Sequence, residues 1–209
     1  MASKAKQQLR TIDMDIGATL SIGSSNVPAS SPLIMAHESQ ASRPSSNKHV
    51  DYMRQALDLA RKSPPKPTNY RVGALLVDSK TDNILTSGYT LECEGNTHAE
   101  QSCFIKLARE HNVQEEELAG ILPEGTVLYT TVEPCFKRLS GNLPCVQRIL
   151  SLGKAIKTVY AGVKEPEKFV GENTGRKQLE DAGIEVVLVE GMEKEILKVA
   201  TAGHVPEGS

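Results

Sequence analysis

The pattern of hydrophobic and polar residues in this 209-residue chain changes near residue 47. Residues 1–46 show no sustained hydrophobic period and are dense in serine, alanine and proline, a composition that cannot support a core of its own. We therefore predict a flexible extension over residues 1–46, in which the short apolar clusters 20–22 and 33–35 could dock on the folded part. Residues 47–209 are predicted to form one folded domain.

From residue 47 onward the pattern predicts helices that alternate with strands. Apolar residues recur at helical spacing after Asn47, and this first helix ends before Ser63-Pro64-Pro65. The later helices are expected at 98–111, 144–152 and 174–182, and the strands at 70–77, 84–88, 126–132, 156–163 and 184–189. The first two strands form a hairpin. This alternation predicts an α/β protein, a three-layer α/β/α sandwich with a mixed central sheet.

The charge balance argues against a nucleic-acid partner. The chain has 24 Lys and Arg against 26 Asp and Glu, whereas nucleic-acid-binding domains usually carry a basic excess. The acidic run 115–117 is interpreted as a solvated face. No apolar run is long enough for a membrane span or a signal peptide, and four cysteines without a disulfide framework indicate a reducing compartment. We expect a cytoplasmic protein that has no membrane partner.

The candidate chemistry lies in His98-Ala99-Glu100, in Glu133-Pro134-Cys135 and in Cys145. One imidazole and two thiols suit a catalytic zinc site, in which three protein ligands leave the fourth position to water. Glu100 is then free to carry protons between that water and a substrate. His-x-Glu with a later Pro-Cys-x-x-Cys is the pattern of zinc deaminases that act on nucleobases, although nine residues separate the cysteines here. We predict His98, Cys135 and Cys145 as zinc ligands and Glu100 as the catalytic residue.

Two other interpretations of these residues stay open. A structural zinc site could be closed by Cys93 or Cys103, or the cysteines could simply be buried without a metal. A structural zinc site, in which all four ligands come from the protein, would not need a carboxylate at the position of Glu100. Cys103 lies on an apolar helical stripe with Leu107, which favours a core thiol, and Cys93 lies in a loop without an evident role.

The expected helix starts add a geometric condition. His98 and Cys145 both fall at helix N-termini, where the positive end of the helix dipole favours a thiolate and a neutral imidazole. Residues two apart point to opposite sides of a regular helix. His98 and Glu100 can therefore flank one water only if the metal lies over the end of the helix.

Three segments carry a resemblance to a known family. They are Asn69–Gly73, Gly95–Glu100 and the stretch from Ala161 through Pro166 to Ala182-Gly183-Ile184. Through them the chain resembles the cytidine-deaminase-like superfamily over about residues 48–191, and within it the riboflavin-pathway pyrimidine deaminases. Tyr70 replaces a proline of that family's pattern. The stretch from Cys135 to Cys145 is most similar to the fungal form.

The resemblance implies a cytidine-deaminase-like fold and a specific reaction. The implied substrate is 2,5-diamino-6-ribitylamino-4(3H)-pyrimidinone 5'-phosphate, whose 2-amino group is hydrolysed to give the pyrimidinedione phosphate and ammonia. Glu100 would move the protons, Asn69 would bind the base or sugar, and Glu165 would lie near the sugar chain. The phosphate would be bound by residues of the loop between the cysteines, which are Lys137, Arg138, Ser140 and Asn142.

The resemblance also implies a zinc cofactor and a homodimer. The alternative for the loop residues is a solvated basic turn. A tRNA adenosine deaminase or a deaminase of free bases or nucleosides remains a second function, although a tRNA enzyme would normally have two residues between the cysteines and a basic surface. The non-enzymatic alternative is a zinc-stabilised binding module, against which the position of Glu100 argues.

Overall fold

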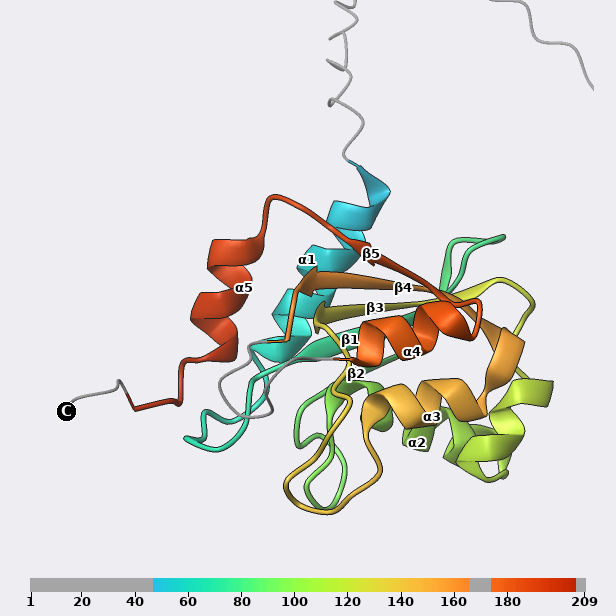
Figure 1. Ribbon diagram of the computed structural model, residues 1–209, viewed down its shortest axis with the longest axis horizontal. Coiled ribbons are helices and arrows are strands. Elements are labelled where there is room, and N and C mark those ends of the chain that lie inside the picture. The colour runs from blue at the N-terminus through green and yellow to red at the C-terminus, as the bar shows by residue number, and fades with distance from the viewer. Residues whose placement is uncertain (1–46, 166–173, 206–209) are drawn as a thin grey trace, which may run out of the picture. The chain divides into compact units, whose positions relative to one another are not determined.

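The structure, a computed structural model, describes residues 47–165 and 174–205, so the predicted extension over residues 1–46 lies outside the described part. These residues form a five-stranded sheet with strand order β2-β1-β3-β4-β5 (Figure 1). The elements in chain order are α1 (Lys48–Ala60), β1 (Gly73–Asp78), β2 (Asn83–Tyr89), α2 (Ala99–His111), the 3-10 helix η1 (Glu115–Gly120), β3 (Thr126–Val132), α3 (Cys145–Ser151), the 3-10 helix η2 (Gly153–Ala155), β4 (Ile156–Val163), α4 (Gly175–Asp181), β5 (Glu185–Leu188) and α5 (Glu193–Ala200).

The sheet mixes both strand orientations, as predicted. Strand β1 is antiparallel to β2 and to β3, whereas β3, β4 and β5 are parallel to one another. Strands β1 and β3 are buried along their whole lengths because helices cover both faces at the centre of the sheet. The predicted α/β class with a mixed sheet is confirmed.

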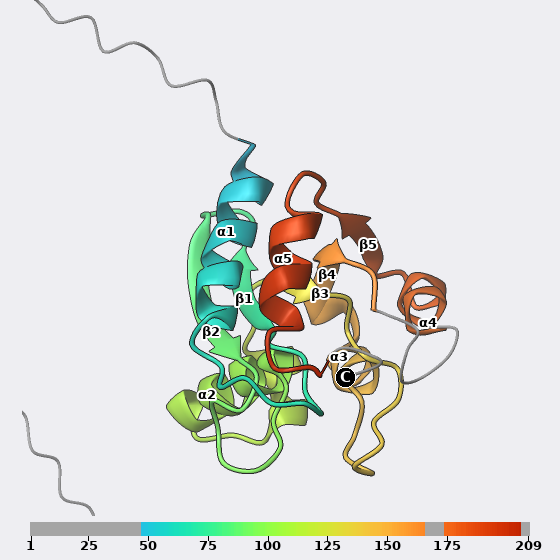
Figure 2. The ribbon, with the colours of Figure 1, turned by 90° about the vertical axis from the view of Figure 1, so that its left-hand side faces the viewer.

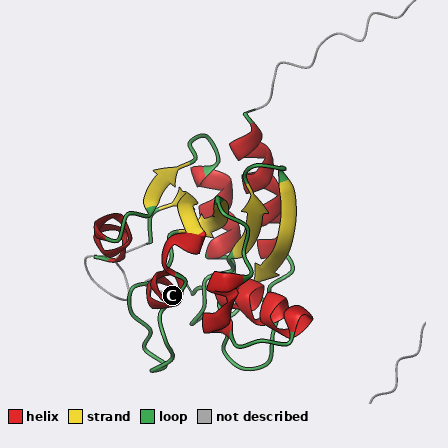
Figure 3. Cartoon of the chain, turned by 90° about the vertical axis from the view of Figure 1, so that its right-hand side faces the viewer, coloured by secondary structure: helices red, strands yellow, loops and turns green. Residues whose placement is uncertain are grey.

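Helices form one layer on each side of the strands. Helices α1 and α5 lie side by side on one face, as Figure 2 shows. Met53 and Leu57 of α1 pack there in one cluster with Ile196 of α5. The strands lie between this layer and the layer of α2, α3 and α4 (Figure 3). This arrangement is the predicted three-layer sandwich.

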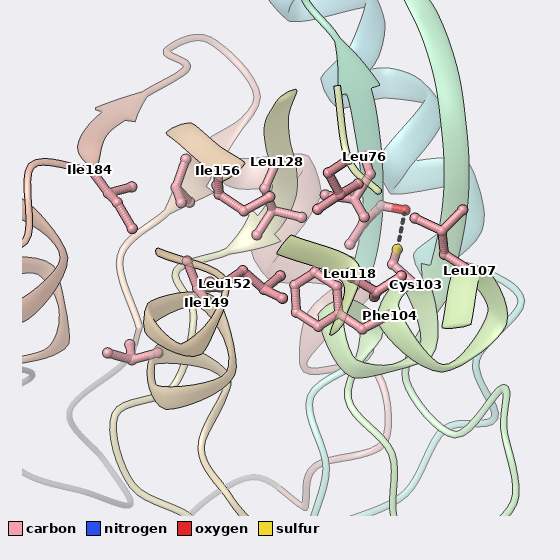
Figure 4. Packing of buried hydrophobic residues seen from close by; sticks show 14 of the residues in the cluster. Leu76, Cys103, Phe104, Leu107, Leu118, Leu128, Ile149, Leu152, Ile156 and Ile184 are labelled. Carbon is pink, nitrogen blue, oxygen red and sulfur yellow. Dashed lines mark hydrogen bonds between the residues drawn. The ribbon is translucent and has the colours of Figure 1, made fainter. Parts of the chain in front are cut away.

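The second layer holds the larger apolar cluster (Figure 4). Phe104 of α2, Leu118 of η1 and Ile149 of α3 pack with Leu128 and Ile156 from the sheet. All five side chains are almost completely buried. Helix α2 packs mainly on β1 and β2 and also contacts α3, and the N-termini of α2 and α3 lie close together.

A close approach of α1 to β1 depends on Gly73. A Cβ atom at this position would lie 1.9 Å from the carbonyl oxygen of Ala56 and 2.7 Å from the nitrogen of Ala60. No side chain fits in this space. Glycine thus sets the distance between helix and sheet just where the chain enters β1.

Some details differ from the sequence prediction. The hydrophobic pattern places residue 70 in the first strand, whereas β1 begins at Gly73. The preceding backbone bonds elsewhere, since the Arg71 N–H donates to the Ala200 carbonyl oxygen (3.0 Å). The acidic run 115–117 belongs to η1 and is not merely a solvated face, because Glu115 pairs with Arg148 at 2.6 Å. No helix within 47–165 and 174–205 combines the length and the apolar character needed to cross a bilayer.

Candidate active site

Three potential metal ligands meet where two helices begin beside the end of β3. His98 is the N-cap residue of α2, Cys145 is the first residue of α3, and Cys135 follows β3 after a short turn. The Cys135 sulfur lies 3.4 Å from His98 Nδ1, and the Cys145 sulfur lies 3.6 Å from the same atom. The three donor atoms all lie within 4.8 Å of one another.

This donor set fits zinc. Zn–S bonds of about 2.3 Å and Zn–N bonds of about 2.0–2.1 Å place a sulfur and a nitrogen roughly 3.6 Å apart in a tetrahedron. The observed separations of 3.4 and 3.6 Å match that value. Among the described residues, this trio is the group of His, Cys, Asp and Glu side chains arranged to hold a metal. Cys93 and Cys103 are not part of it, which argues against a closed structural site.

Cys103 lies in the apolar core instead. Its side chain is 0% exposed, and its thiol donates to the Ala74 carbonyl oxygen at 3.6 Å, the dashed contact in Figure 4. Burial raises the pKa of this thiol well above its usual value. Cys103 is thus a core thiol, as its position on the apolar stripe predicts.

The pKa values of the two cysteines in the cluster shift in opposite directions. A hydrogen bond from Cys145 lowers the pKa of Cys135 to about 4, and the neighbouring His98 adds to the effect. The same hydrogen bond and complete burial raise the pKa of Cys145. The backbone N–H of Cys145 also donates to the Cys135 sulfur (3.4 Å). The lowered pKa of Cys135 favours its thiolate, which is the form that binds zinc.

Glu100 lies beside the cluster in the first turn of α2. Its side chain is only 3% exposed, and its Oε1 accepts a hydrogen bond from the Thr130 hydroxyl at 3.2 Å. The Cys145 thiol donates to Oε2 at 3.4 Å. Burial raises the pKa of this carboxyl, which brings it closer to the range where a group can both take and release a proton.

The backbone at His98 meets the geometric condition stated above. His98 has extended dihedral angles, φ −88° and ψ 165°, because it precedes the first helical residue, Ala99. Its imidazole is therefore not bound by the helical rule that separates residues two apart. His98 and Glu100 both line one cavity at the end of α2.

This cavity has a volume of about 270 Å³. Its wall brings together eight of the ten residues that the sequence suggests for the site, which are Asn69, His98, Glu100, Cys135, Lys137, Arg138, Ser140 and Glu165. Cys145 is buried behind the wall, where its sulfur reaches His98. Asn142 does not line the cavity and is exposed on the loop, so the structure does not place it with the others.

The loop between the cysteines separates its two basic residues. Lys137 is exposed and has no ion-pair partner among residues 47–165 and 174–205. Arg138 is only 8% exposed, and its guanidinium donates to Gln101 Oε1 at 2.9 Å and to the Asn96 carbonyl oxygen. Arg138 thus fastens the loop to α2 and to the segment before His98, a role that the residue type alone does not reveal.

Asn69 lines the same cavity. Its Nδ2 donates to the Asn96 side-chain oxygen at 2.8 Å, and its Oδ1 accepts from the Thr68 hydroxyl at 2.9 Å. Asn96, which also lines the cavity, therefore connects Asn69 to Arg138.

Glu165 forms part of an acidic wall. Burial, followed by the negative charges of Cys135, Glu100 and Glu133, raises the pKa of Glu165 to about 8. Its backbone N–H donates to Glu133 Oε2 at 3.3 Å. Glu133 is a buried cavity residue that the sequence reasoning missed, although its place directly before Pro134-Cys135 is a signal. Tyr70 was missed in the same way, although its replacement of a proline marks it.

Comparison with known proteins adds a family. The sequence profile of the "cytidine and deoxycytidylate deaminase zinc-binding region" matches residues 46–163. The diaminohydroxyphosphoribosylamino-pyrimidine deaminase of Schizosaccharomyces pombe is 34% identical over 159 residues, which are 76% of this chain and 36% of that protein. The riboflavin biosynthesis protein RibD of Bacillus amyloliquefaciens is 35% identical over 136 residues, 65% of this chain and 32% of that protein. The chain spans about a third of the length of these curated relatives.

Solved structures point the same way. The Rib2 deaminase of Aspergillus oryzae, as a C-terminal deletion mutant at pH 6.5, superposes with a TM-score of 0.68 at 48% identity, over 75% of this chain and 92% of that chain. The same enzyme in complex with DARIPP also gives a TM-score of 0.68 at 48% identity, over 75% and 91% of the two chains.

Proposed function

The chain belongs to the cytidine and deoxycytidylate deaminase zinc-binding family, and we propose that it hydrolyses the 2-amino group of 2,5-diamino-6-ribitylamino-4(3H)-pyrimidinone 5'-phosphate to release ammonia in riboflavin biosynthesis. The observation that carries the proposal is the convergence of His98, Cys135 and Cys145 beside the buried carboxyl of Glu100 on one cavity. The family and the cytidine-deaminase-like fold suggested by the sequence motifs are confirmed.

The choice of substrate is supported by the relatives. The yeast relative is named for a diaminohydroxyphosphoribosylamino-pyrimidine, and the Aspergillus enzyme binds DARIPP. The charge of the site agrees with a phosphorylated pyrimidine, because Lys137 is exposed at the cavity wall while the carboxyls of Glu100 and Glu165 lie deeper. A polyanion such as tRNA fits less well, since the net charge of the chain is -2.

The zinc ion is proposed to be held by His98, Cys135 and Cys145. When bound, zinc supplies a Lewis acid that lowers the pKa of a water molecule at its open position. Glu100 takes a proton from the attacking water and delivers it to the ring nitrogen beside the carbon that bears the amino group. Glu100 then takes the second proton, from the hydroxyl group added to this carbon, and gives it to the amine. The C–N bond breaks as the carbonyl forms, and ammonia leaves. Thr130 holds Glu100 in place for both transfers.

The remaining wall residues have binding roles in this proposal. Asn69 hydrogen-bonds the base or the sugar, and Glu165 lies near the sugar chain. Lys137 and Ser140 meet the phosphate by charge-assisted hydrogen bonds. Arg138 braces the loop that carries them, because its guanidinium is already bound to Gln101 and to the Asn96 carbonyl oxygen.

Ammonia release from the proposed pyrimidine phosphate tests the function. Glu100→Gln should keep zinc and lose about two to four orders of magnitude in kcat, since it removes proton transfer but not a ligand. The matched variants His98→Ala, Cys135→Ala and Cys145→Ala should each lose zinc, measured as metal content. Full activity in Glu100→Gln would refute the mechanism, and efficient turnover of cytidine or of a tRNA adenosine would refute the substrate.

The homodimer and the cytoplasmic location remain predictions. The dimer is implied by the resemblance, and the location by the cysteine content, since none of the four cysteines forms a disulfide. Sedimentation of the zinc-loaded protein at micromolar concentration tests the dimer; a single monomeric species would contradict it.

A further inference from the structure

The segment that follows α5 lies against one wall of the cavity. The loop between α1 and β1 supplies Pro67, Thr68, Asn69 and Tyr70 to that wall. His204 reaches this loop from the C-terminal side, and its Nε2 lies 3.1 Å from the Asn69 carbonyl oxygen. Figure 2 shows the segment after α5 passing the loop that enters β1.

A second contact accompanies the hydrogen bond. The His204 ring packs at an angle of 56° on the ring of Tyr70, with 4.7 Å between the centroids. One imidazole thus touches two consecutive residues of the wall, one through its backbone and one through its ring. Since a carbonyl oxygen only accepts, Nε2 must carry the hydrogen in this arrangement.

The approach of the segment is close and directed. A Cβ atom at Gly203 would lie 2.3 Å from the Lys66 nitrogen and 2.7 Å from the Lys66 carbonyl oxygen. The His204 N–H donates to the Thr201 carbonyl oxygen at 2.9 Å, which turns the chain back toward the loop. The Arg71 N–H, on the far side of the wall residues, donates to the Ala200 carbonyl oxygen. Backbone contacts at both ends therefore hold His204 opposite Asn69 and Tyr70.

We propose that His204 is a positioning residue, which holds the Asn69–Tyr70 wall in the conformation that binds the substrate. The imidazole does not act on the reacting atoms. Its hydrogen bond fixes the backbone of Asn69 and its ring contact fixes the side chain of Tyr70, and both residues line the cavity. This proposal rests on the proposed function in one respect only, which is the use of the pyrimidine phosphate as the substrate in the kinetic test. Loss of the His204 contacts should affect substrate binding and not zinc binding or Glu100. The zinc ligands and Glu100 belong to other elements, which are α2, α3 and the end of β3.

Steady-state kinetics on the full chain test the role. His204→Ala should raise KM for the pyrimidine phosphate roughly 3- to 10-fold, as expected for one lost neutral hydrogen bond, while kcat and zinc content stay unchanged. His204→Gln, which keeps an N–H at a similar reach, should recover most of the lost affinity. Val205→Ala is the matched control, since Val205 is 63% exposed beside it, and should behave as the wild type.

A further variant separates the ring contact from the hydrogen bond. His204→Phe keeps the ring against Tyr70 but has no N–H, so it should raise KM as His204→Ala does while keeping the wild-type melting temperature. An unchanged KM in both His204→Ala and His204→Phe would overturn the proposal. Equal losses in kcat, zinc content and KM would also overturn it, since they would indicate a general structural role.

Amide hydrogen exchange keeps the test independent of the substrate. Loss of the His204 contact should speed exchange in residues 66–72 and leave α2 unchanged, because opening of one wall is a local event. If His204→Ala speeds exchange in residues 66–72 but the wild type does not turn over the pyrimidine phosphate, the proposed substrate is refuted and the positioning role is supported. Unchanged exchange in His204→Ala would refute the positioning role even if the wild type deaminates the pyrimidine.

Discussion

The neighbouring basic residues Lys137 and Arg138 should have opposite mutational profiles. Arg138 is 8% exposed and donates to Gln101 Oε1 and to the Asn96 carbonyl oxygen, whereas Lys137 is exposed at the cavity wall. Lys137→Ala should therefore impair phosphate binding alone. Arg138→Ala should lower the free energy of unfolding and make the cavity wall around Asn96 less rigid.

The magnitude for Arg138 follows from its contacts. Each hydrogen bond from a charged group contributes about 1.5–3 kcal/mol, and truncation also leaves two acceptors unpaired. The Arg138 Nε atom is buried and has no hydrogen-bond partner within the described part of the chain, so the alanine variant loses one unfavourable group. We expect a net loss of about 2–3 kcal/mol, which lowers the melting temperature by roughly 4–12 °C for a domain of this size.

Kinetics on the phosphorylated pyrimidine and on its dephosphorylated analogue complete the comparison. Arg138→Ala should raise KM for both forms alike, because Asn96, which it holds, is hydrogen-bonded to Asn69. Lys137→Ala should raise KM about tenfold for the phosphorylated form only, without a change in melting temperature. The reasoning is refuted if Arg138→Ala leaves the melting temperature unchanged and impairs only the phosphorylated substrate, since the guanidinium would then be a phosphate ligand.

Three further predictions concern other parts of the chain. Burial raises the pKa of the Glu165 carboxyl to about 8, so this group is protonated at neutral pH and ionises as the pH rises through 8. KM should therefore increase above pH 8 in the wild type but not in Glu165→Gln, and parallel KM profiles of the two proteins would contradict this. Gly73→Ala should lower the free energy of unfolding by about 1–3 kcal/mol in denaturant titrations, whereas Gly120→Ala, where a Cβ meets nothing, should change it by less than about 0.5 kcal/mol. Deletion of residues 1–46 should leave a zinc-loaded domain that unfolds cooperatively in calorimetry, and loss of cooperativity would show that the extension is part of the fold.

The elements that the sequence predicts well are those whose burial follows a regular period. The β-branched run of β3 and the helical spacing of α1 each reflect contact with one continuous surface, so their bounds agree closely with the prediction. Helix α5 was not anticipated. It has eight residues, half of them charged, and only Ile196 and Ala200 are fully buried. Its buried residues are four apart, as in a helix, but a segment this short offers few apolar positions from which to recognise the period, and its place is decided by packing against α1 and β4.

The residues of the site also fall into those that the sequence predicts and those that it does not. His98, Glu100 and Cys135 are recognisable because zinc chemistry demands these residue types close to element ends, where their backbones are constrained. Arg138 and Lys137 are adjacent and carry the same charge, yet only one is buried, because an irregular loop has no period that tells which side chain turns inward. His204 contacts Asn69 across 135 positions of sequence. Residue identity thus predicts which groups can react or bind metal, but the braces that shape the cavity depend on contacts between segments that meet only after folding.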